Sequence, residues 1–174
     1  LPPVSNWRTT DQDELIRRRL RAAKESMRFR NLMPEQPVFS NFNVESASGQ
    51  TYQVELRHLE PLTSACTCVD FQVNGLGTCK HVEALLRWLR SDAATLRQAE
   101  AEGSPRIDLV PDIATGRLMV ERNLNLLPAG LRGFFDITGL ALPEFSKEEI
   151  LAAFNKANRP AVRVSQEVAT WIGQ

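Results

Sequence analysis

The sequence predicts a small α+β protein in which a β-hairpin leads into a cluster of metal-ligand side chains and then into a helix. Residues 51–56 alternate between apolar and polar side chains, as a half-buried strand does. Residues 82–89 carry apolar side chains three and four positions apart, as a helix does. All three cysteines fall between these two segments. With 43% hydrophobic and 24% charged residues among 174, the chain can build an ordinary globular core.

The N-terminal part predicts a basic helix after a loose lead-in over residues 1–8. Thr10 precedes Asp11 and Asp13, a pattern typical of a helix start, and Pro34 ends the helix near residue 32. One apolar stripe runs along it, made of Ile16, Leu20, Ala23 and Met27. The same segment carries a dense set of basic residues, namely Arg17, Arg18, Arg19, Arg21, Lys24, Arg28 and Arg30. We assign residues 1–35 to this N-terminal basic helix.

The middle of the chain, residues 36–103, predicts a hairpin, a metal-ligand cluster and a helix. Short β-like stretches at 38–44 and 51–56 are joined by a turn-rich link at 45–49. Glycines and an asparagine at 74–77 predict a turn inside the cluster. The helix that follows Cys79 is expected to continue to about residue 101, before Gly103 and Pro105.

Residues 104–174 predict a further α+β segment, either an accessory unit or a linker toward another domain. Stretches at 107–110 and 118–120 flank a turn and indicate a second hairpin. Ser146 and Glu149 form the pattern of a capping box for a helix that ends before Pro160. Ser165 is placed to cap a last short helix that contains Trp171.

The chemistry of the sequence is concentrated in Cys66, Cys68, Cys79 and His81, which follow the pattern C-x-C-x(10)-C-x-H. Two cysteines two residues apart on an extended segment point to one face. A Cys3His set matches the tetrahedral donors of one structural zinc ion and leaves no position for a catalytic water. The alternatives are three buried cysteines beside an ordinary histidine, or another metal such as iron.

The cluster resembles the SWIM zinc finger, in the form found ahead of the motor of bacterial Swi/Snf-type helicase-like ATPases. The similarity covers residues 36–92 and lies in the stretches 66–71 (C-T-C-V-D-F) and 76–81 (L-G-T-C-K-H). Val69 stands where that family has a proline. The resemblance implies a DNA- or protein-recognition region of a DNA-dependent ATPase whose motor is not in this sequence. The chain itself is then not an enzyme.

Partners are less well defined by the sequence than the metal ligands are. The residues most suited to contact DNA phosphates are basic side chains of the first helix and of the zinc knuckle, namely Arg17, Arg18, Arg21, Lys80, Arg87 and Arg90. The alternative partner is a protein, either an adaptor target or the motor domain itself, with zinc only holding the shape. Phe71 and Trp88 are expected in the core, and His58 on the surface of a strand.

Enzymatic function is not favoured by the remaining motifs. His81-Val-Glu83 matches half of a zinc-deaminase signature, but no cysteine follows Cys79, so Glu83 is interpreted as a solvated helix residue. The segment 75–80 fails the phosphate-loop pattern, because His81 follows Lys80.

Composition and the ends of the sequence set the remaining expectations. The net charge of zero gives no general attraction to nucleic acid or membranes, and no small-molecule substrate is indicated. Clustered thiols predict a reducing, cytoplasmic setting. The chain begins with Leu1 rather than Met, so we expect a longer parent protein.

Overall fold

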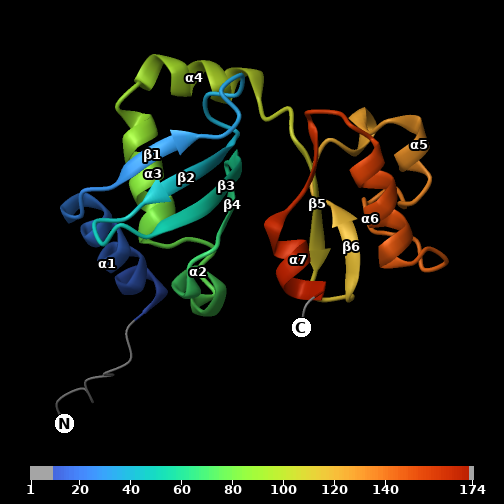
Figure 1. The fold of residues 1–174 in the computed structure, drawn as a ribbon, viewed down its shortest axis with the longest axis horizontal. Helices are drawn as coiled ribbons and strands as arrows, with labels where there is room; N and C mark the ends of the chain where they lie inside the picture. Colours follow the sequence, from blue (N-terminus) through green and yellow to red (C-terminus); the bar gives the residue numbers. More distant parts are fainter. Residues whose placement is uncertain (1–9, 173–174) are drawn as a thin grey trace, which may run out of the picture. The chain divides into compact units, whose positions relative to one another are not determined.

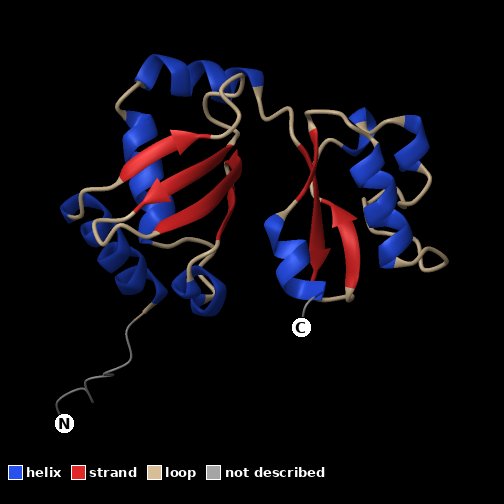
Figure 2. Ribbon diagram, in the orientation of Figure 1, coloured by secondary structure: helices blue, strands red, loops and turns tan. Residues whose placement is uncertain are grey.

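The computed structural model describes residues 10–172 and has the α+β fold expected from the sequence (Figures 1 and 2). The lead-in predicted for residues 1–8 lies outside the described residues. The chain divides into two compact units, Leu1–Glu102 and Gly103–Gln174. Each unit has its own sheet and its own hydrophobic core.

The first unit contains one four-stranded antiparallel sheet with the strand order β1-β2-β3-β4. Its elements are α1 (Asp11–Lys24), β1 (Arg28–Asn31), β2 (Asn41–Glu45), β3 (Thr51–Leu59), β4 (Leu62–Cys66), α2 (Val69–Asn74), α3 (Lys80–Arg90) and α4 (Ala93–Glu102). The predicted hairpin is confirmed as β2 and β3. The turn between them is closed by a bond from the Ser46 amide to the Gln50 carbonyl, 2.8 Å long.

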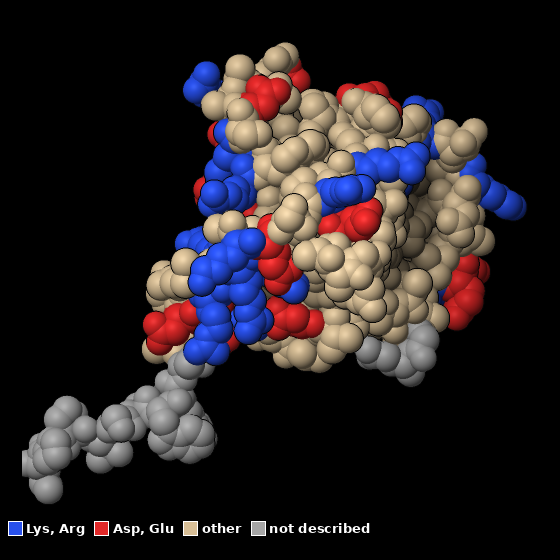
Figure 3. All heavy atoms as spheres, turned by 60° about the vertical axis from the view of Figure 1, so that its left-hand side comes forward, with Lys and Arg blue, Asp and Glu red and all other residues tan. Residues whose placement is uncertain are grey.

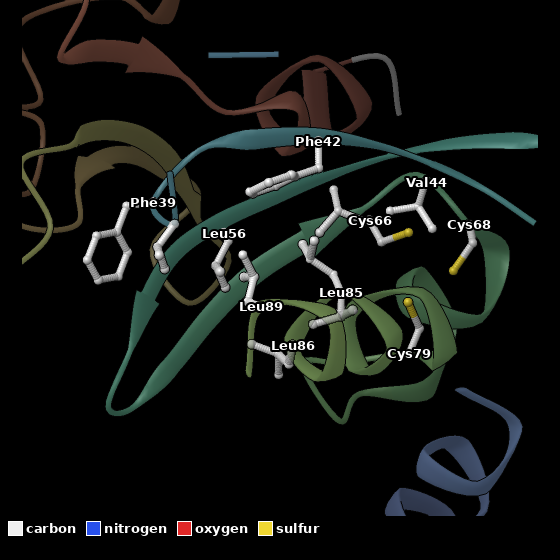
Figure 4. Packing of buried hydrophobic residues seen from close by; sticks show 13 residues of the cluster. Phe39, Phe42, Val44, Leu56, Cys66, Cys68, Cys79, Leu85, Leu86 and Leu89 are labelled. Atoms are coloured by element: carbon white, nitrogen blue, oxygen red, sulfur yellow. The ribbon is translucent and has the colours of Figure 1, made fainter. Parts of the chain in front are cut away.

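The core of the first unit lies between this sheet and α3 (Figure 4). Phe42 and Leu56 from the sheet, and Leu85 from the helix, are completely enclosed. Burial of each such side chain contributes roughly 1.5–3 kcal/mol to the stability of the folded state. The core continues without interruption into the three cysteines, which are buried in the same cluster. Metal ligands and apolar packing therefore form one continuous structure.

The first helix is shorter than the sequence predicted. It begins with the expected N-cap Thr10, which forms a capping box with Asp13, but it ends at Lys24. Residues that were predicted to extend it form β1, because Phe29 there stacks on Trp88 with ring centroids 5.1 Å apart. Tertiary packing overrides helix propensity at this point.

The apolar stripe of this helix faces outward. Ile16 and Leu20 are 44% and 54% exposed, whereas Arg18 and Ala22 are buried.

Two further expectations about the first unit need correction. The helix after Cys79 is interrupted at Ser91 and Asp92, where the Asp92 carboxylate accepts bonds from the Thr95 amide and hydroxyl and starts α4. Trp88, expected in the core, is 43% exposed, although one ring face lies on Phe29.

The second unit has a three-stranded sheet with the order β6-β5-β7, in which β5 pairs antiparallel with β6 and parallel with β7. Its elements are β5 (Ile107–Asp112), β6 (Arg117–Val120), a 3-10 turn η1 (Leu124–Leu126), α5 (Ala129–Arg132), α6 (Lys147–Lys156), β7 (Val162–Val164) and α7 (Gln166–Ile172). The predicted hairpin and the capping box of Ser146 and Glu149 are confirmed. The Ser165 hydroxyl also accepts a bond from the Glu167 amide, as the capping prediction required.

Candidate metal centre

The structure brings the four predicted metal ligands together. Cys66 is the last residue of β4, Cys68 precedes α2, Cys79 precedes α3, and His81 lies in the first turn of α3. Their ligand atoms all lie within 4.8 Å of one another, and all four residues are buried. Figure 4 shows the three sulfur atoms pointing toward one another from the ends of these elements.

The spacing of the donor atoms fits a tetrahedral ion. The Nδ1 atom of His81 is 3.8 Å from the Cys66 sulfur and 3.7 Å from the Cys79 sulfur. Zinc bonds of about 2.3 Å to sulfur and 2.0–2.1 Å to nitrogen, at tetrahedral angles, place such atoms about 3.6 Å apart. These four residues could therefore hold a metal ion.

A compact loop returns the chain from the first pair of ligands to the second. Asn74 organises this loop through both ends of its side-chain amide. The NH2 group donates to the Thr78 backbone carbonyl at 2.8 Å, and the side-chain oxygen Oδ1 accepts from the Leu76 amide at 2.7 Å. Gly75 and Gly77 adopt φ values of +70° and +72°, which residues with a side chain rarely occupy. The turn predicted at 74–77 thus brings the second pair of ligands back beside the first pair.

The imidazole of His81 is held in one orientation. Its ring stacks on Tyr52 of β3, with centroids 4.1 Å apart. The Nε2 atom is buried and has no hydrogen-bond partner among the described residues, while Nδ1 faces the thiols. Nδ1 is therefore the donor available to a metal. Sequence reasoning did not find the role of Tyr52, because the stacking depends on how β3 pairs with its neighbours.

The thiols create an environment that a cation would neutralise. Hydrogen bonds from Cys66 and Cys79 lower the pKa of Cys68, whereas the hydrogen bond with Cys68 raises the pKa of Cys66 to about 12. Hydrogen bonds with Cys66 and Cys68 raise the pKa of Cys79 as well. The lowered pKa of Cys68 favours its thiolate form, which the two neighbouring thiols stabilise. A metal that binds all three as thiolates has to displace protons, so its binding weakens as the pH falls.

The first helix is attached to the metal centre by ion pairs. The Arg18 guanidinium donates two bonds to Asp70, at 2.9 and 2.7 Å, and Asp70 lies two residues after Cys68. This contact raises the pKa of Arg18 and lowers that of Asp70. Arg18 also donates to Glu14 at 2.8 Å.

Two more ion pairs join the same helix to α3. Lys80, between Cys79 and His81, is 2.8 Å from Glu25, at the end of α1. Glu83, two residues after His81, is 3.2 Å from Arg19. Glu83 is only 5% exposed, so the expectation of a solvated side chain was wrong. The first helix therefore docks onto the metal-ligand segment mainly through polar contacts.

The basic residues proposed as phosphate contacts divide into those that have an acidic partner among the described residues and those that have none there. Arg18 is 9% exposed and occupied by Asp70 and Glu14, so it is a structural residue and is not available to DNA. Lys80 is half-buried and paired as described above. Arg17 is exposed but lies 3.5 Å from Glu14.

Three of the nominated residues are exposed and unpaired among residues 10–172, namely Arg21, Arg87 and Arg90. Figure 3 shows Lys and Arg side chains gathered at the lower left, where α1 lies, with Asp and Glu side chains beside them. This face carries mixed charge rather than a continuous basic stripe.

Two other expectations concern the surroundings of the site. His58 is half-buried and lies 3.3 Å from the Pro61 carbonyl through Nδ1, and it is not among the clustered metal donors. Phe71 is half-buried and packs against the core, as predicted. Within residues 10–172, no helix has the length and apolar character needed to cross a membrane.

Comparison with known proteins gives no further guide to the function. Neither a family model, nor a curated protein, nor a solved structure matches this chain. The geometry of the site and its sequence motif are therefore the basis for inferring a function.

Proposed function

We propose that the first unit is a zinc-binding module in which one zinc ion, held by Cys66, Cys68, Cys79 and His81, has a structural role. The observation that carries this proposal is the convergence of four buried donors within 4.8 Å. A set of three thiolates and one imidazole favours zinc over magnesium or calcium, which prefer oxygen ligands. With four protein ligands the ion has no open position, so its contribution is to folding rather than to hydrolysis.

We further propose that this module is a SWIM-type finger, which serves as a recognition region of a Swi/Snf-type DNA-dependent ATPase. The support is the C-x-C-x(10)-C-x-H motif on a hairpin that leads into a helix. Recognition of DNA phosphates is assigned to the exposed basic residues Arg17, Arg21, Arg87 and Arg90. A protein-binding adaptor is the second candidate, favoured by the outward-facing Ile16 and Leu20.

Zinc content tests the first part of the proposal. Elemental analysis of the purified chain should find one zinc per molecule. The variant His81→Gln removes one donor and should lose most of the metal. His58→Gln changes the only other histidine of the chain and should keep it. Equal zinc content in the two variants, or none in the wild type, would refute the site.

Binding to short duplex DNA across a salt series tests recognition. Phosphate contacts release counterions, so log K falls with log salt with a slope of roughly −0.9 for each phosphate neutralised. Charge reversal by Arg21→Glu with Arg87→Glu should weaken binding and flatten this slope. Arg117→Glu, in the second unit, is the matched control and should bind as the wild type does. Absence of binding at low salt would favour the protein adaptor.

A further inference from the structure

The first unit contains a hollow on its surface that the metal site does not use. Its volume is about 270 Å³, and it is formed by α1, the β3–β4 turn, α3 and α4. Part of its lining is made of leucine side chains, among them Leu62, Leu86 and Leu96. Acidic and basic side chains make up the rest, so the hollow combines an apolar patch with charged groups.

A buried carboxylate opens into this hollow. Glu83 is 5% exposed, and one of its oxygens accepts a bond from the Nε of Arg19 at 3.2 Å. The other oxygen accepts no hydrogen bond from the described residues and is not one of their fully enclosed unpartnered atoms. This oxygen therefore remains accessible from the hollow that Glu83 lines. A cation that enters the hollow can therefore form a charge-assisted hydrogen bond with this oxygen.

The other charged groups around the hollow leave an excess of negative charge. Glu60 and Glu100 line it and have no ion-pair partner among residues 10–172. The cations are Arg19, which is already bound to Glu83, and Arg90. Three carboxylates thus face two guanidiniums. The balance favours a cation over an anion as the group that enters.

We propose that this hollow binds a basic side chain, arginine or lysine, presented by a partner protein. The aliphatic stem packs against the leucines, and the charged head reaches Glu83, Glu60 and Glu100. Long basic side chains are suited to such a site because their methylene groups bury well while the head stays charged. The contact of Arg19 with Glu83 is an internal example of the same recognition. Arg90 lines this hollow and also belongs to the proposed DNA-contact residues, but binding of a basic side chain here does not depend on the DNA contact.

The test uses the full chain with N-acetyl-arginine amide as the probe. Binding is measured through the chemical shifts of the protein's backbone amides. Saturable shifts should appear at Glu83, Leu86 and Glu100. N-acetyl-citrulline amide has nearly the same shape without the charge, and it should bind at least about tenfold more weakly. Binding of N-acetyl-lysine amide measures whether the planar guanidinium is preferred.

Variants locate the site. Glu83→Gln should weaken binding by about tenfold or more, since it removes a buried charged acceptor. Because that change also removes the partner of Arg19, the double variant Glu60→Gln with Glu100→Gln is the second test. It leaves the internal ion pair intact and should weaken binding about two- to fivefold per residue. Glu148→Gln, on α6, is the control and should have no effect.

Three results would overturn the proposal. They are equal binding of the citrulline compound, an unchanged affinity in the double variant, and shifts that map away from the hollow.

Discussion

The two units of the chain differ in what their hydrophobic cores contain. In the second unit the core cluster contains no cysteine and includes edge-to-face aromatic pairs such as Phe135 and Phe154, whose centroids are 5.9 Å apart. In the first unit three of the buried core residues are the cysteines of the candidate metal site. The end of β4 and the starts of α2 and α3 meet at that site. The second unit is closed by hydrophobic packing, and the first, if the proposed zinc ion is bound, by a metal as well.

Removal of the metal should produce the largest difference between the units. Structural zinc contributes on the order of 10–16 kcal/mol in small finger peptides, more than the net stability of most domains. A strong chelator should therefore unfold residues 36–90 and leave residues 107–172 folded. Amide spectra recorded before and after chelation distinguish the two sets. Loss of neither set, or loss of both together, would contradict the comparison.

A core substitution in the second unit should destabilise that unit and leave the first unit folded. Ile150 is 1% exposed, and Ile150→Ala should cost about 2–5 kcal/mol through lost burial and the cavity that remains. Zinc content and the amide signals of the first unit should be unchanged. Denaturant unfolding with separate reporters in each unit measures this. A fall in zinc stoichiometry would show that the units are not independent.

Removal of an ion pair that attaches α1 should have an intermediate effect on stability. Arg18→Met removes the bonds to Asp70 and should cost about 1–3 kcal/mol, because both bonds involve charged groups but Asp70 is partly solvated. Arg17→Met, at the exposed neighbouring position, is the matched control and should stay within about 0.5 kcal/mol. Denaturation midpoints of the zinc-loaded proteins provide the measurement. If the two variants were equal, α1 would be held by other contacts.

The smallest expected effect concerns Asp136 in the second unit. The hydroxyl of Thr138 donates to its carboxylate and lowers its pKa, helped by bonds from backbone amides. A depressed pKa stabilises the folded state above the unfolded value, near 3.9, and this contribution is lost as the pH falls through the folded pKa. Wild type should therefore lose slightly more stability than Asp136→Asn below about pH 4. Identical pH profiles would show that the turn does not depend on this charge.

Local features of the fold could be predicted well from the sequence. The caps at Thr10, Ser146 and Ser165 involve side chains and amides only two or three residues apart, so the pattern of neighbours is sufficient. The β2–β3 hairpin followed from alternation and a short turn. The metal ligands were found for a similar reason, since a C-x-C pair and a C-x-H pair each position two donors locally.

Features that depend on distant residues could not be predicted in this way. The strand β1 looked like a continuation of the helix until its pairing with β2 was known. Arg18 looked like one of many exposed arginines, yet its partner Asp70 is 52 positions away. The sequence showed an apolar stripe that includes Ile16 and Leu20, but not that these two side chains are exposed while Arg18 on the same helix is buried against Asp70.

By itself the sequence determined the donor set, its spacing and the starts of the helices, because these are set by side-chain chemistry and by bonds between close neighbours. Only the tertiary structure decided which arginines are free, which face of α1 is exposed and where Glu83 lies. Those outcomes depend on competition between polar pairing and apolar burial across distant segments, and no local pattern records which one prevails.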